Sequence, residues 1–146
     1  MSLNRRSFWL GIPALALVLT AFASIPRDDE IRAIRQAVQY YIDGHATGQR
    51  EVMEQAFHES ARLQSIRDGA VNVWPIEDYL AGSRGQPAAD ESERRRRVVS
   101  IDYHGTAAVA KIELDYPSVV FTDYMHLLKI GDEWKIVNKI YHADRK

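Results

Sequence analysis

The chain contains no cysteine. It therefore forms no disulfide, carries no thiolate nucleophile and offers no cysteine for lipid attachment, so packing has to hold the fold together. Histidine is scarce too, and His58, His126 and His142 are too widely spaced to match any known metal-site pattern. We expect no bound metal and no other cofactor.

Neither sign of charge dominates. The 19 Lys and Arg residues nearly balance 20 Asp and Glu residues, for a formal net charge of -1 over 146 residues. A chain of this kind has no general electrostatic attraction to nucleic acid or to an anionic membrane, and neither is an expected partner. The run DESERRRR at residues 90–97 mixes both signs and is interpreted as a solvated loop.

Long apolar runs are rare, and the most prominent one lies within MSLNRRSFWLGIPALALVLTAFA at residues 1–23. Arg5 and Arg6 precede it, and the small-x-small motif at residues 21–23 ends it, which predicts a cleavable export signal. The two arginines also resemble a bacterial twin-arginine signal. An uncleaved anchor is the alternative, although a membrane span needs about 20 apolar residues. We expect an exported protein, periplasmic or secreted, with one domain at residues 24–146 and no membrane anchor after cleavage.

The remaining chain shows helical patterns first and strand patterns afterwards. An apolar stripe at helical spacing predicts a first helix, carried by Ile31, Ile34, Val38, Tyr41 and Ile42. A second short helix is expected near residues 50–57 and a third after Pro75, with an Asp68-Gly69 hairpin between them. Four strands are then expected at 98–104, 106–116, 119–130 and 133–142. This order predicts an α+β fold with helices on one face of an antiparallel sheet.

Four segments carry a resemblance to a known family: YIDG, FHESARL, VWPIEDYL and FTDYMHLLKIGDEWKIVNKIYH, at residues 41–44, 57–63, 73–80 and 121–142. Together they resemble the nuclear transport factor 2-like superfamily, in its small bacterial lumazine-binding or polyketide-cyclase-like branch, over nearly all of residues 28–142. The resemblance implies a cone in which three helices pack into the concave face of a curved antiparallel sheet. It also implies an interior pocket and frequent dimerisation, but no single activity.

Side-chain alternation along the last two strands predicts which residues face the cone. The outward markers are taken to be Lys129, Lys135 and Lys139. Tyr124 and His126 then face inward, and a loop at residues 131–133 places His126 opposite Asn138. A two-residue turn at Gly131-Asp132 reverses that pairing.

This assignment of faces supplies the candidate site. The predicted ligand-binding residues are Tyr41, Trp74, Tyr79, Tyr124, His126 and Asn138. His126 is the candidate acid or base, because imidazole titrates near neutral pH; alternatively, His126 and Asn138 satisfy each other in a packed core. The same alternation puts Glu113, Asp115 and Asp123 outside, which argues against an isomerase that works through interior carboxylates.

We therefore expect a non-catalytic protein that binds a small organic molecule in a partly aromatic pocket. One alternative is a metal-free lyase, isomerase or cyclase centred on His126, and another is an interaction domain whose cone is filled. A homodimer through the sheet is also predicted, because the outward set includes apolar side chains. These are Phe121, Met125, Leu127, Val137 and Tyr141.

Overall fold

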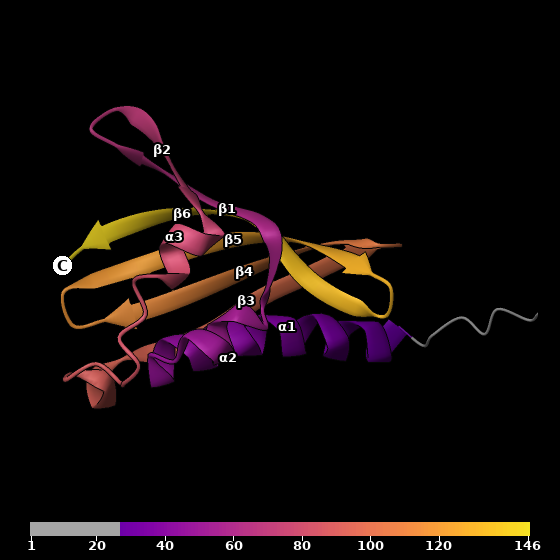
Figure 1. Ribbon diagram of the computed structural model, residues 1–146, viewed down its shortest axis with the longest axis horizontal. Helices are drawn as coiled ribbons and strands as arrows, with labels where there is room; N and C mark the ends of the chain where they lie inside the picture. Colours follow the sequence, from indigo (N-terminus) through magenta and orange to yellow (C-terminus); the bar gives the residue numbers. More distant parts are fainter. Residues whose placement is uncertain (1–26) are drawn as a thin grey trace, which may run out of the picture.

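The computed structural model describes residues 27–146, and the predicted export signal lies outside them. Helices and strands form two layers, with α1 and α2 beneath a long curved sheet (Figure 1). In chain order the elements are α1 (Arg27–Thr47), α2 (Arg50–Glu54), β1 (Phe57–Arg67), β2 (Ala70–Pro75), α3 (Ile76–Leu80), a short 3-10 helix (Glu91–Glu93), β3 (Arg95–His104), β4 (Ala107–Tyr116), β5 (Val119–Ile130) and β6 (Glu133–Arg145). The predicted α+β class and the helices on one face of the sheet are confirmed.

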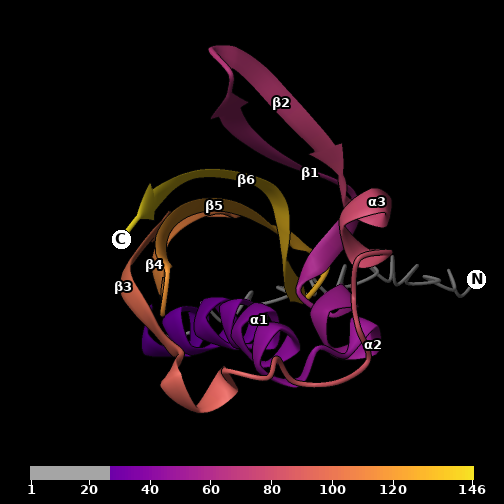
Figure 2. The same cartoon turned by 90° about the vertical axis from the view of Figure 1, so that its left-hand side faces the viewer.

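The sheet has six strands in the order β2-β1-β6-β5-β4-β3. Figure 2 shows β3 to β6 arching over α1, while the β1–β2 hairpin extends away from the arch. The expected antiparallel meander of β3, β4, β5 and β6 is confirmed, and β1 pairs with β2 antiparallel but with β6 parallel, so the sheet as a whole is mixed and not antiparallel throughout. Strand β1 follows a helix, not a hairpin turn, and nothing local forces it to run against its neighbour.

Helix α1 supplies the floor of the cone through the stripe predicted for it. Ile34, Val38 and Tyr41 are fully buried, and each aliphatic side chain of this kind stabilises the fold by about 1.5–3 kcal/mol. At the first turn, the Glu30 carboxylate accepts a hydrogen bond from Nε1 of Trp134 at 2.8 Å and pairs with the Lys129 ammonium. These contacts fix the start of α1 against the turn end of the β5–β6 hairpin.

Two glycines near the end of α1 allow other segments to approach closely. A Cβ atom on Gly44 would lie 2.7 Å from the Cβ atom of Met53 on α2, closer than side chains pack. Gly48 has φ of +69°, and a Cβ atom there would lie 2.0 Å from the Gln86 carbonyl oxygen. The Gly85 amide also donates to the Gly48 carbonyl at 2.9 Å. The loop between α3 and β3 is thereby held across the end of α1.

The β5–β6 hairpin contains a bulge that overturns the predicted faces. The turn is the two-residue Gly131-Asp132 form, and Leu127 pairs with Ile136, but His126 pairs with Asn138. Val137 is the extra residue, and an extra residue reverses the alternation of the strand beyond it. Inward positions in β6 therefore pass from Trp134 and Ile136 to Lys139 and Tyr141, while β5 buries Asp123, Met125 and Leu127.

Candidate functional site

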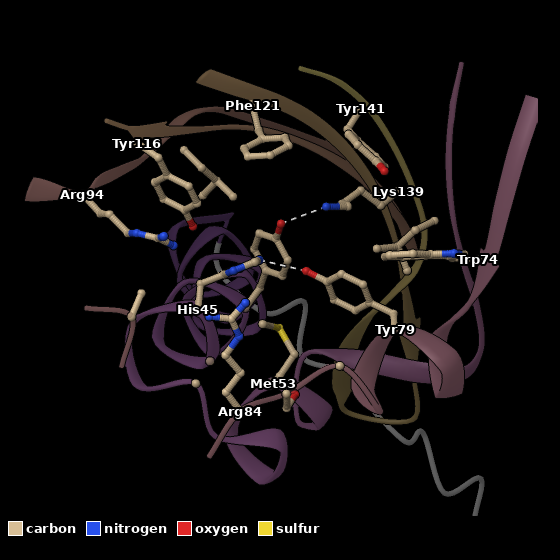
Figure 3. Close-up of a pocket in the computed structure, with 18 of the residues that line it drawn as sticks. His45, Met53, Trp74, Tyr79, Arg84, Arg94, Tyr116, Phe121, Lys139 and Tyr141 are labelled. Carbon is tan, nitrogen blue, oxygen red and sulfur yellow. Dashed lines mark hydrogen bonds between the residues drawn. The ribbon is translucent and has the colours of Figure 1, made fainter. Parts of the chain in front are cut away.

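A cavity of about 530 Å³ lies between the concave sheet, α1, α3 and the loop that follows α3. This volume is within the range that small-molecule sites occupy. Side chains from the sheet and from the helices converge on it (Figure 3). The lining residues are Tyr41, Gly44, His45, Gly48, Met53, Leu63, Trp74, Asp78, Tyr79, Gly82, Ser83, Arg84, Gln86, Ala88, Arg94, Leu114, Tyr116, Phe121, Lys139 and Tyr141.

Aromatic rings make up much of this wall and support one another. The Tyr41 ring meets His45 edge-on at 4.6 Å between centroids, and Tyr116 meets Phe121 at 5.9 Å. Such pairs contribute about 0.5–1.5 kcal/mol beyond the area that they bury. The rings are therefore held in place, and the aromatic wall of the cavity is already formed.

Lys139 is an enclosed cation within this aromatic wall, and its side chain is only 6% exposed. Its ammonium nitrogen lies 4.7 Å from the ring centroid of Tyr141, 5.0 Å from that of Tyr41 and 5.6 Å from that of Tyr79. Ring faces stabilise an ammonium group by about 0.5–2 kcal/mol when water is excluded. The three tyrosines form a cage around the end of Lys139, which projects from β6 toward the cavity (Figure 3).

A carboxylate and a hydroxyl complete the surroundings of this amine. Lys139 Nζ donates to the Tyr41 hydroxyl oxygen at 2.9 Å and lies 3.4 Å from Oδ1 of Asp123. The Tyr41 hydroxyl donates to Oδ2 of Asp123 at 2.6 Å. Asp123 is fully buried, so the expectation that no carboxylate lies inside the cone is wrong. Sequence alternation missed it because Asp123 was read as a solvent-facing charge.

Burial shifts the titration of both partners of Asp123. Enclosure lowers the pKa of Lys139, although Asp123 opposes that shift, because a low-dielectric site disfavours an ammonium ion. Burial and the Asp123 charge raise the pKa of the Tyr41 hydroxyl well above its usual value, which keeps that hydroxyl protonated. The amine is thus easier to deprotonate than a surface lysine, and its neighbour stays a proton donor.

A second polar pair joins Tyr79, one of the cage tyrosines, to His45. The Tyr79 hydroxyl and Nε2 of His45 are 2.9 Å apart, as the dashed line in Figure 3 shows. Burial lowers the pKa of His45 to about 3, and the positive charges of Lys139, Arg96 and Arg94 add to the effect. The imidazole is therefore neutral at physiological pH and resists protonation, and its Nε2 is 2.9 Å from the Tyr79 hydroxyl as a hydrogen-bond partner. His45 lies one helical turn after Tyr41 on the same stripe, a spacing by which the sequence could have revealed it.

Two arginines line the cavity and a third is buried close to it. Arg84 and Arg94 line it, and the Arg94 guanidinium lies 4.2 Å from the Tyr116 ring centroid while it donates to Asp90 at 2.8 Å. Arg96 is 6% exposed at its side chain and donates twice to Glu91, at 2.5 Å and 2.8 Å. Arg94 and Arg96 therefore point inward, whereas Ser92, Glu93, Arg95 and Arg97 are exposed, so the interpretation of residues 90–97 as a solvated loop is correct for only part of the run. A mixed charge run does not reveal which of its ions pair inward.

The structure divides the predicted site residues into two groups. Tyr41, Trp74 and Tyr79 line the cavity; their part in ligand binding stays a prediction. The remaining three are Tyr124, His126 and Asn138, and they lie on the outer face of the sheet. The prediction that they face the cone is therefore wrong, and with it the placing of His126 as an interior acid or base.

His126 and Asn138 do lie opposite each other, as expected, but in contact with solvent. Nδ2 of Asn138 is 3.3 Å from Nδ1 of His126, and Gln64 Nε2 donates to the Asn138 side-chain oxygen at 2.7 Å. Lys129 and Lys139, which the sequence alternation predicts to face outward, instead meet Glu30 and Asp123 within the cone. Glu30 on α1 and Asp123 on β5 allow these two lysines to face inward, because each supplies a buried carboxylate as a partner. A local sequence pattern cannot predict a partner that lies far away in the chain.

A family model described as "Putative lumazine-binding" matches residues 29–142. The chain belongs to this lumazine-binding family. Its fold is also that of solved nuclear transport factor 2-like proteins of unknown function. One from Shewanella baltica is 28% identical, with a TM-score of 0.76 and coverage of 84% of this chain and 100% of that one. Another from Methylobacillus flagellatus is 30% identical, with a TM-score of 0.69 and coverage of 82% and 95%.

More distant matches to this chain have other descriptions. A ketosteroid isomerase-like protein from Erwinia carotovora atroseptica shares the fold at 10% identity, with a TM-score of 0.61 and coverage of 80% of this chain and 97% of that one. A curated protein named Aldolase FrzH, from Cladobotryum sp, is 20% identical over 114 residues, which are 78% of this chain and 91% of that protein. The family description suggests small-molecule binding.

Across residues 27–146, no three His, Asp or Glu side chains gather in a way that could hold a metal ion. None of the helices formed by those residues combines the length and the apolarity that a membrane crossing requires.

Proposed function

We propose that this protein binds a small planar molecule, aromatic or conjugated, through a carbonyl oxygen that accepts a hydrogen bond from Lys139. The observation that carries this proposal is the Lys139 amine, which projects into a cavity walled by aromatic rings. The rings offer flat apolar contact area, and one enclosed donor fixes the orientation of the ligand. The cavity also supports binding over the alternative of a filled cone.

The chemistry of the mouth extends the description of the ligand. Arg84 and Arg94 line the cavity and keep contact with solvent, so a charged group beside them loses less of its hydration than it would deeper inside. We therefore place an acidic substituent of the ligand beside Arg84 and Arg94. Lumazine, which the family description names, is a planar heterocycle with ring carbonyl groups and suits this arrangement. The name Aldolase, carried by a relative, also supports a carbonyl compound.

A fluorescence titration with lumazine tests the proposal. Ala88 lines the cavity whereas the next residue, Ala89, is exposed and does not line it. We expect saturable binding that Ala88→Trp weakens by about tenfold or more, because the indole fills the mouth. Ala89→Trp adds the same indole outside and is expected to leave the affinity unchanged. Equal affinities in both variants, or no saturable binding of lumazine, would contradict the proposal.

We also propose that two copies pair through the outer face of the sheet. The apolar residues first assigned to that face include Phe121, Met125 and Leu127, and they point into the cone instead, so the original basis for a dimer is wrong. The outer face nevertheless carries a contiguous group of exposed apolar side chains around the His126–Asn138 pair. They are Val109, Tyr124, Leu128 and Ile140. A partner explains such a face better than water does, and two-fold pairs are the commonest soluble assembly.

Export completes the proposed function. Residues 1–23 have the basic start, apolar middle and small-x-small end of a secretory signal. We place the protein in the periplasm or the medium of a bacterium. These compartments are oxidising, and a chain without cysteine cannot form wrong disulfides there.

A further inference from the structure

We propose that Lys139 is a nucleophile that forms an imine with an aldehyde or ketone bound in the cavity. This inference rests on the proposed function, since it requires a carbonyl ligand at Lys139, and it adds a covalent step to binding. Two side chains contact this amine. Asp123 is the proton acceptor in the proposed step, and Tyr41 is the proton donor.

The position of Lys139 is what separates it from the other described lysines. Lys129 is paired with Glu30, and Lys135 donates to the Gln55 carbonyl at 3.0 Å, whereas Lys139 lines the cavity. Its charge is enclosed by rings and by β5, so losing the proton removes a desolvation cost that a surface lysine does not have. The lowered pKa of Lys139 agrees with this geometry. An enclosed amine beside an open cavity is the arrangement that imine chemistry requires.

The step balances with groups already present. The Lys139 ammonium gives one proton to Asp123, which lies 3.4 Å away, and becomes a neutral amine. The nitrogen lone pair attacks the carbonyl carbon, the carbon–oxygen π pair moves to oxygen, and proton transfer from nitrogen to oxygen gives a carbinolamine. Tyr41, 2.9 Å from Nζ, then protonates the hydroxyl group. Water leaves as the C=N bond forms, and Asp123 returns the proton to Tyr41. The sum is lysine ammonium plus carbonyl to iminium plus water.

Reductive trapping tests this inference on the purified full chain. Benzaldehyde is the probe, because it is planar, carries one carbonyl and cannot enolise, and cyanoborohydride reduces the iminium to a stable benzylamine. Peptide mapping by mass spectrometry then locates the modification. We expect Lys139 to be labelled about tenfold more than Lys111 or Lys135 at limiting benzaldehyde. Lys139→Arg keeps a cation but has no primary amine, and it is expected to lose this label, while Lys135→Arg is the matched control that keeps it.

Competition separates this inference from the proposed function. Lumazine has amide-type carbonyls that do not form imines, so it should occupy the cavity and suppress labelling of Lys139. Saturable lumazine binding with no benzyl group on Lys139 overturns the imine and leaves the binding function in place. Labelling spread over exposed lysines, with Lys139 unmodified, also overturns it. Because the wild-type peptide map decides these outcomes, the test holds even if Lys139→Arg folds poorly.

Discussion

The ammonium nitrogen of Lys139 lies 3.4 Å from Oδ1 of Asp123, with both side chains enclosed between the sheet and the helices. Each charge offsets the cost of burying the other, and Tyr41 bonds to both. Among the described residues that are not exposed, no buried side-chain nitrogen or oxygen lacks a partner. Lys139, Asp123 and Tyr41 together form the polar part of the proposed carbonyl site. Because each one is bonded to the other two, we expect the loss of any one of them to disturb the site.

The first prediction concerns this pair. Lys139→Met leaves the Asp123 carboxylate buried without its cation, and we expect unfolding free energy to fall by about 3 kcal/mol. Asp123→Asn should lower the unfolding free energy by a similar amount, because it leaves the Lys139 ammonium buried without its carboxylate. In the double variant neither charge is present, so the loss should be clearly smaller than the sum of the single losses. Denaturant unfolding of all four proteins measures the coupling, and additive losses would show that the two groups do not interact.

The second prediction concerns acid stability. The pKa of His45 is about 3 in the fold and near 6.5 when unfolded, so between these values the unfolded chain binds a proton that the folded chain does not. The contribution of neutral His45 to the free energy of unfolding is therefore fully present above pH 6.5. It is lost as the pH falls toward 3, and the total loss is a few kcal/mol. His45→Gln keeps a neutral hydrogen-bonding group and should flatten this slope.

The pH range and the control isolate His45. Hydrogen bonds with basic partners lower the pKa of the Glu30, Glu91 and Glu113 carboxylates, so they add their own loss of stability in acid. That loss begins near the unfolded carboxylate pKa of about 4.3, and the comparison is therefore made between pH 6.5 and 5 by thermal unfolding. His142→Gln is the control, because His142 is exposed. If His45→Gln retains the wild-type slope, His45 is not the group that titrates.

The third prediction concerns the loop across α1. Gly48→Ala forces a Cβ atom to within 2.0 Å of the Gln86 carbonyl oxygen, and the loop must move away. Gly105→Ala is matched to it, because Gly105 also has a positive φ of +56° but has nothing within 4 Å. Both variants carry the left-handed backbone strain, and Gly48→Ala should lose about 1–3 kcal/mol more. Lumazine affinity should fall only for Gly48→Ala; equal effects in the two variants would contradict a positioning role for this contact.

The fourth prediction concerns the proposed dimer. Tyr124→Asp places a charge in the middle of the exposed apolar group on the outer sheet face and should convert a dimer into a monomer. Ile66→Asp is the control, because Ile66 is 69% exposed on the separate β1–β2 hairpin. Light scattering at micromolar concentration reports the mass. A wild-type monomer under these conditions would refute the dimer.

The fifth prediction concerns export. A cleavage after residues 21–23 should give mature protein that begins at Ser24. Intact mass of material from the periplasm or the medium measures this directly. Replacing Ala23 with Arg blocks the small-residue site and should leave the precursor uncut. Recovery of full-length wild-type chain from the cytosol alone would end the proposal of export.

The local sequence pattern was sufficient to predict the helices, the strands and the α+β class of the fold. Helical spacing of Ile34, Val38 and Tyr41 predicted the face of α1 that packs against the sheet, because an apolar stripe has to be buried. Asp68-Gly69 predicted the β1–β2 hairpin, and Pro75 predicted the start of α3. Each depends on the neighbours of a residue along the chain. The same reasoning brought Tyr41 and Tyr79 to the cavity wall, since both lie on helix faces that pack inward.

The interior chemistry was decided only by tertiary structure. Alternation along a strand is local until an extra residue interrupts it, and the bulge at Val137 turned Lys139 inward and Asn138 outward. Lys129 is enclosed because α1 delivers Glu30 to it, and Lys139 because β5 delivers Asp123. Charges in a strand pattern normally mark solvent, since burying one alone is costly. Partners brought from distant parts of the chain removed that cost, so the sequence by itself determined the cone, and the fold determined which charges lie inside it.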